Sequence, residues 1–193
     1  DGIFASYVLA QLTTQTTVLK QLLDGGYAVV TPTADSSGFA WDTNLPPWDV
    51  DWPPAPDSVF LTALFAAIDG GQLGPLSATR WYATGVSSGG FMTSRMAVSY
   101  DGRFRALAVA AGSYATCGGL PICTGPALPA DHPPTLFLHG AQDPLVPLSQ
   151  MFAYHDALVT LGRETNAIVD ANTKHGWIPA SPAAIVAWFD GHP

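Results

Sequence analysis

Positive charge is the scarcest feature of this chain. Lysine and arginine together number 7 of the 193 residues, against 15 aspartates and glutamates, which gives a formal net charge of -8. A nucleic-acid groove needs a dense basic patch, so the composition argues against nucleic acid as a partner. Long apolar runs are also missing. None approaches the roughly 18 residues that a membrane-spanning helix requires, and no membrane span is expected.

Cysteine is nearly absent as well. Cys117 and Cys123 are the only two, and they lack the further Cys or His ligands that a zinc site would need. We therefore expect no metal site, and nothing in the sequence indicates a cofactor. The two cysteines lie in a Gly-, Pro- and Thr-containing stretch, where they are predicted to form a small local disulfide; two free thiols are the alternative. Such a bond would imply an oxidising, secreted context.

Apolar segments of two kinds alternate along the chain. Hydrophobic residues make up 48% of the sequence, so it is a globular chain rather than a disordered one. Helices are predicted at 4–26, 59–71, 89–100, 149–161 and 181–190, and strands at 27–32, 80–86, 105–112, 134–140 and 166–170. This alternation favours one α/β domain over residues 1–193, a mostly parallel sheet with helices on both faces. Such sheets usually begin with strands, whereas this chain begins with a helix. The first part of the sheet is therefore expected to be missing, and the domain to be N-terminally incomplete.

The stretch Gly85-Val86-Ser87-Ser88-Gly89 has the pattern G-x-S-x-G between a predicted strand and a predicted helix. That context places a serine on a tight turn above the sheet, and the residues two before and two after it must be small. Only Ser87 has glycine at both offsets, so Ser87 is the candidate nucleophile. The backbone amide of Ser88, at the start of the helix, is then a candidate donor to a developing oxyanion.

A serine nucleophile needs a base, usually a histidine held by a carboxylate, and in such sheets the chain order is Ser, acid, His. Asp143 follows a predicted strand, and His175 lies in a Gly-containing loop before the last helix. Asp170 is the rival acid, at a weaker strand end and close to the histidine in sequence. His139 is expected to support the Asp143 loop by hydrogen bonding. The remaining histidines have no expected catalytic part: His132, His155 and His192.

These segments resemble the extracellular depolymerases of medium-chain-length polyhydroxyalkanoates, which are α/β-hydrolases. The resemblance is carried by "TGVSSGGFMTSRMAVSY", "FRALAVAAGSYATC", "DHPPTLFLHGAQDPLVP" and "HGWIP", and "WDTN" and "PDSVFLTALF" extend it over most of the chain. It implies Ser87 as nucleophile, Asp143 as acid and His175 as base, in a secreted bacterial enzyme without a metal. The second oxyanion donor of that family comes from a loop ahead of the first helix. That loop would lie before Asp1 or at its edge, so the donor is unknown here.

The sequence thus predicts a secreted serine ester hydrolase that acts on hydrophobic polyesters through an acyl-enzyme. A carboxylesterase or feruloyl-type esterase for small soluble esters is the first alternative, and a non-catalytic hydrolase-like binding protein is the second. Trp41 and Trp177 are candidate substrate contacts. Trp41 lies with Trp48 and Trp52 in a long Pro-rich connection, 33–56, and these side chains either line a substrate cleft or pack that connection onto the core.

Overall fold

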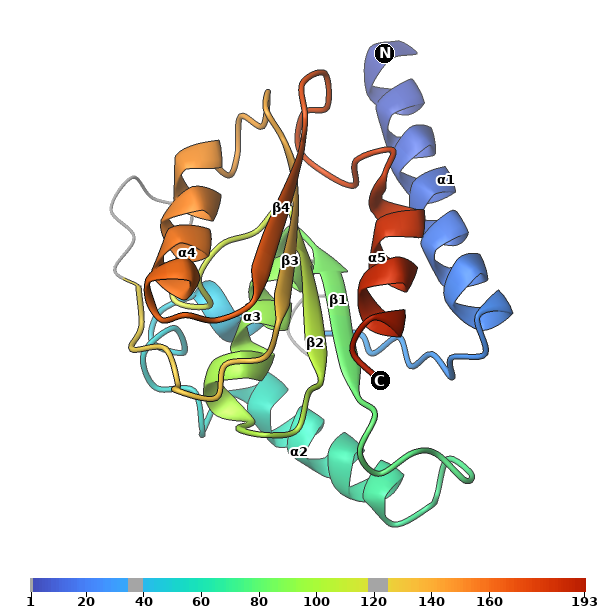
Figure 1. Ribbon diagram of the computed structural model, residues 1–193, viewed down its shortest axis with the longest axis vertical. Helices are drawn as coiled ribbons and strands as arrows, with labels where there is room; N and C mark the ends of the chain where they lie inside the picture. The colour runs from blue at the N-terminus through green and yellow to red at the C-terminus, as the bar shows by residue number, and fades with distance from the viewer. Residues whose placement is uncertain (1, 35–39, 118–124) are drawn as a thin grey trace.

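Three layers make up the molecule, with a parallel sheet between two groups of helices (Figure 1). The computed structural model describes residues 2–34, 40–117 and 125–193. The sheet has four strands in the order β1-β2-β3-β4, each parallel to its neighbour. The strands are β1 (Tyr82–Val86), β2 (Ala106–Ala110), β3 (Thr135–Gly140) and β4 (Thr165–Asp170).

The two central strands are continuous apolar runs because both of their faces are covered. Every residue of β2 and β3 is buried, whereas β1 and β4 at the sheet edges are largely half-buried. Alternate residues of β2 face opposite layers. Ala108 belongs to the same apolar cluster as Ile185 and Phe189, while Val109 belongs to the cluster on the other face with Phe91. The α/β architecture predicted from the alternating segments is confirmed.

Two helices cover one face of the sheet and three lie on the other (Figure 1). The first pair consists of the first and last helices of the chain, α1 (Gly2–Asp24) and α5 (Ser181–Asp190), which pack against each other. The other group is α2 (Pro56–Asp69), α3 (Ser88–Ser99) and α4 (Leu148–Thr160). A short 3-10 turn, η1 (Asp42–Asn44), precedes α2. No helix in the described part of the chain is both long and apolar enough to cross a membrane.

The predicted strand at 27–32 is wrong: this segment is irregular and mostly exposed. A strand requires a paired neighbour, and in the described residues β1 pairs only with β2. Between β1 and 27–32 lies a groove of about 990 Å³, which we call the edge groove. The groove is lined by α1, the segment 27–32, α2, α3 and the edge of β1 that has no strand partner in the described part of the chain. Whether further strands precede residue 1 stays a prediction.

Candidate active site

A sharp turn joins β1 to α3, and Ser87 occupies it. Its backbone has φ 58° and ψ -122°, a conformation that non-glycine residues rarely adopt. The surrounding backbone holds it there: the Ser87 N–H donates to the Ala110 carbonyl at 3.0 Å, and the Ser87 carbonyl accepts from the Phe91 N–H at 3.0 Å. A residue kept in a strained conformation by its neighbours is often functional, and this one presents its hydroxyl at the end of a strand.

The turn depends on Gly85 more than on Gly89. A Cβ on Gly85 would lie 2.4 Å from the Gly89 carbonyl oxygen, a contact that backbone atoms cannot relieve without moving the helix. A Cβ on Gly89 would meet nothing within 4 Å. The sequence-based requirement for a small residue two positions after the serine is therefore wrong for this chain. The backbone of Gly89 lies where a side chain at position 85 would be, so position 85 must be glycine. Position 89 has room for a side chain.

Asp143 lies three residues beyond the end of β3, and its side chain is fully buried. Its Oδ1 accepts two backbone hydrogen bonds, from Leu145 at 2.8 Å and Val146 at 2.9 Å. Burial by itself would raise the pKa of this carboxyl, but the hydrogen bonds from His175 and from these two amides outweigh burial and lower the pKa below its usual value. Asp143 is therefore a carboxylate at neutral pH.

His175 connects the acid to the serine. Its Nδ1 lies 2.8 Å from Asp143 Oδ2, and its Nε2 lies 2.7 Å from Ser87 Oγ. Because a carboxylate only accepts, Nδ1 carries the proton and Nε2 is left to accept from the Ser87 hydroxyl. The three side chains singled out in the sequence thus form one hydrogen-bonded line.

Gly140, which the sequence analysis did not single out, lets the histidine loop approach the acid. A Cβ at Gly140 would lie 2.2 Å from the Lys174 carbonyl oxygen and 2.3 Å from that of Thr173. The Gln142 N–H also donates to the Thr173 carbonyl at 3.1 Å. The loops after β3 and β4 therefore touch through their backbones. A glycine as the last residue of a buried strand was the available signal.

The other candidates lie outside this line. Asp170 turns back on its own loop, where Oδ1 accepts from the backbone of Asn172 and from Thr173. His139 is buried beside Asp143, as expected for a residue that supports the acid loop. The remaining histidines contact other groups: His132 the Tyr154 hydroxyl, His155 the Asp156 carboxylate and His192 the Trp188 carbonyl.

The two neighbouring serines have different surroundings. Ser88 is the first residue of α3, so its N–H has no acceptor within the helix and is available at the turn. Its hydroxyl faces the described part, 40–56, of the Pro-rich connection, which we call the Trp-bearing connection. There it accepts a hydrogen bond from the Trp41 N–H at 2.7 Å. Ser88 therefore ties that connection to the same turn that presents Ser87.

Arg95, in the middle of α3, fixes the connection more firmly, and the sequence analysis missed it. Its guanidinium donates to Thr43 Oγ1 at 2.9 Å, to the Thr43 carbonyl at 2.8 Å and to the Asp49 carbonyl at 2.9 Å. It also lies over the ring of Trp52, 5.0 Å from the ring centroid. Burial lowers the pKa of Arg95 to about 10, so it remains charged at neutral pH. A lone arginine in an otherwise uncharged helix was the signal.

The sequence left open whether the tryptophans line a substrate cleft or pack onto the core, and the structure places them in both kinds of position. Trp41 is half-buried and lines the edge groove close to Ser87 and Ser88. Trp177 also borders the groove, but its side chain is 6% exposed and belongs to the core between the sheet and α5. Trp52 is buried and packs the connection onto α3, and half-buried Trp48 lies against the same cluster. The core-packing reading therefore describes Trp52 and Trp48 best.

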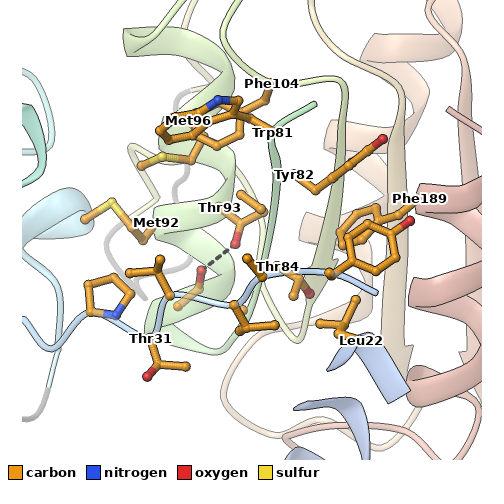
Figure 2. Close-up of a pocket in the computed structure, with 18 of the residues that line it drawn as sticks. Leu22, Thr31, Trp81, Tyr82, Thr84, Met92, Thr93, Met96, Phe104 and Phe189 are labelled. Carbon is orange, nitrogen blue, oxygen red and sulfur yellow. Dashed lines mark hydrogen bonds between the residues drawn. The ribbon is translucent and has the colours of Figure 1, made fainter. Parts of the chain in front are cut away.

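The edge groove is lined mainly by apolar side chains (Figure 2). Leu22 and Phe189 lie toward one end of the view and Met92 and Met96 toward the other. Thr93, from the wall of α3, turns its hydroxyl back to the Gly89 carbonyl at 2.8 Å and so presents no free donor. The groove therefore offers an apolar surface beside Ser87.

Only one of the two cysteines of the predicted disulfide lies in the described residues. Cys117 is buried, with 1% of its surface exposed, whereas Cys123 lies outside the described residues. The Cys117–Cys123 bond stays a prediction.

Known proteins resemble this chain in both sequence and fold. It is 51% identical over 177 residues to a poly(3-hydroxyoctanoate) depolymerase of Pseudomonas fluorescens, covering 91% of this chain and 63% of the relative. The chain thus spans somewhat less than two thirds of that relative's length. No family model matches.

Among solved structures, MGS-M1, an α/β-hydrolase enzyme from a Medee basin deep-sea metagenome library, superposes with a TM-score of 0.59 at 16% identity, over 72% of this chain and 64% of that one. A putative dienelactone hydrolase of Klebsiella pneumoniae gives 0.54 at 21% identity, over 72% and 63%. A Bacillus cereus carboxylesterase gives 0.54 at 10% identity, over 69% and 58%. At these identities the likeness concerns the fold.

Proposed function

We propose that this chain, which has the α/β-hydrolase fold and is similar to the poly(3-hydroxyoctanoate) depolymerase of Pseudomonas fluorescens, is the catalytic part of a serine ester hydrolase acting on hydrophobic polyesters. The observation that supports the proposal most is the line of hydrogen bonds from Asp143 through His175 to the Ser87 hydroxyl. This is the arrangement that makes a weak hydroxyl nucleophile reactive.

In the proposed reaction, the Ser87 hydroxyl attacks the ester carbonyl while His175 Nε2 takes its proton. Asp143 stabilises the positive charge that forms on the imidazole. The carbonyl oxygen becomes an oxyanion and accepts a hydrogen bond from the Ser88 N–H, with a second donor not identified among these residues. Collapse of this intermediate breaks the bond to the alcohol, which leaves with the proton from His175. Water then attacks the acyl-serine with His175 again as base, and releases the acid and the free serine.

The polyester substrate is supported by the relative's name and by the character of the surface. The sequence is low in charge, and an apolar groove runs beside Ser87. Trp41, held at the turn by Ser88, is the proposed substrate contact next to the nucleophile. We also propose that the enzyme works outside the cell, on the strength of the resemblance and of the predicted disulfide.

Labelling with a fluorophosphonate probe tests the nucleophile. The full-length protein is expected to be labelled, and Ser87→Ala to abolish labelling. Ser88→Ala is the matched control, because it keeps the backbone amide at that position and should still be labelled. Loss of labelling only in Ser88→Ala, or no labelling of the unmodified protein, would refute the serine mechanism and leave a binding protein.

Hydrolysis of a poly(3-hydroxyoctanoate) latex, compared with p-nitrophenyl esters of increasing chain length, tests the substrate. We expect clearing of the latex and higher activity on medium-chain than on short-chain esters. Activity confined to short soluble esters would replace the polymer by small esters as the substrate class.

A further inference from the structure

A second histidine lies against the catalytic acid. His139 is the last residue but one of β3, and its side chain is fully buried. Its Nε2 lies 2.9 Å from the Val146 carbonyl oxygen and 3.4 Å from Asp143 Oδ2, the same carboxylate oxygen that binds His175. The serine mechanism described above gives His139 no part.

The surroundings of the ring determine where its proton is. Both groups near Nε2, the Val146 carbonyl and the Asp143 carboxylate, only accept hydrogen bonds, so Nε2 must carry a hydrogen. The other ring nitrogen, Nδ1, is buried and has no hydrogen-bond partner in the described part of the chain. A second proton on Nδ1 would therefore be a buried donor with no acceptor, which is costly.

Burial and the groups around the ring also favour the neutral form of His139. Burial is the largest influence and lowers the pKa of His139, and a charged His175 would lower it further. The Val146 carbonyl and Asp143 act in the opposite direction, without reversing the shift. His139 is thus a neutral imidazole that donates from Nε2 only.

We propose that His139 is a positioning residue for the acid: its Nε2–H donates to the Val146 carbonyl and lies 3.4 Å from Asp143 Oδ2, close enough to attract that negatively charged oxygen and keep it toward His175. This inference rests on the proposed serine mechanism. Oδ1 is already held by the amides of Leu145 and Val146, whereas two histidine rings, His175 and His139, lie near the other oxygen.

Two substitutions separate this effect from simple support of the loop. His139→Leu keeps an apolar side chain without a donor, and His139→Gln supplies an N–H near the position of Nε2. For the full-length protein with a soluble ester, His139→Leu is expected to lower kcat roughly tenfold to a hundredfold with little change in KM, as for a small displacement of a catalytic group. His139→Gln should recover most of the lost kcat. An unchanged kcat in His139→Leu, or a folded His139→Gln as impaired as His139→Leu, would overturn the proposal.

The state of the ring can be tested without catalysis, by NMR of the unsubstituted protein labelled with 15N-histidine. The signal that His139→Gln removes should show a neutral ring protonated at Nε2 throughout about pH 5 to 8, where an ordinary histidine titrates. Titration within that range, or a proton on Nδ1, would refute the proposal even if His139→Leu does not fold. Because this readout needs no activity, its failure is distinguishable from failure of the serine mechanism itself.

Discussion

Two regions meet at Ser87 and are held in place by different means. On one side, the loops after β3 and β4 touch through their backbones and bring Asp143 and His175 together. The Asp143 side chain is held there by backbone amides of its own loop. On the other side, the Trp-bearing connection is held by side chains far away in sequence, Ser88 and Arg95 of α3. The comparison indicates that the hydrogen-bonded line of Ser87, His175 and Asp143 is built into the sheet, whereas the proposed substrate contact depends on one helix surface.

This division predicts that substitutions in the first region impair chemistry most, and that those in the second region impair stability and substrate use.

Asp143→Asn should lower kcat by about 10⁴-fold, because an amide at this position favours the wrong tautomer of His175. Asp170→Asn is the matched control, since that carboxylate binds only its own loop, and it should leave kcat within about twofold. Steady-state kinetics on a soluble ester measure both. Comparable losses in the two variants would remove the distinction between the two acids.

Gly85→Ala should destabilise the fold by about 3 kcal/mol or more and abolish labelling of Ser87, because its Cβ would collide with the backbone of Gly89. Gly89→Ala, with open space around its Cβ, should stay within about 1 kcal/mol of the unsubstituted protein. Denaturant unfolding gives both values. Equal effects would mean that the turn is not packed as described.

Arg95→Met should lower the free energy of unfolding by about 3 kcal/mol, since it leaves the Thr43 and Asp49 carbonyls without their charged donor and removes the cation from above Trp52. Activity on a short soluble ester should fall less than activity on the polymer latex, because only the second region is loosened. A uniform loss on both substrates would argue that the connection also shapes the hydrogen-bonded line of Ser87, His175 and Asp143.

The smallest expected effect is the loss of the stability contributed by Asp143 at acidic pH. The folded pKa of Asp143 lies below its ordinary value of 3.8, so its contribution to stability is fully present above that value. It should be lost as the pH falls through the folded pKa. Below about pH 4, the stability difference between the unsubstituted protein and Asp143→Asn should therefore shrink. Thermal unfolding at a series of pH values measures this, and a difference that grows toward low pH would contradict the sign.

The parts of the site that were predictable follow local rules. A Gly-x-Ser-x-Gly turn between a strand and a helix needs only neighbouring residues, and the ends of parallel strands share one edge, so the order of Ser87, Asp143 and His175 was informative. The strand expected at 27–32 failed because strand formation depends on a partner that the apolar pattern does not reveal. Arg95 was missed because its acceptors, the backbone around Thr43 and Asp49, lie in a segment with no regular pattern.

The amino-acid sequence by itself determined the helices, the four strands that pair and the identity of the three hydrogen-bonded side chains, since these depend on periodicity, turn chemistry and chain order. Only the tertiary structure decided which glycine the turn requires, which tryptophans are buried in the core and which one stays beside Ser87. Those outcomes depend on distances between atoms of residues remote in sequence, which packing sets and no local pattern records.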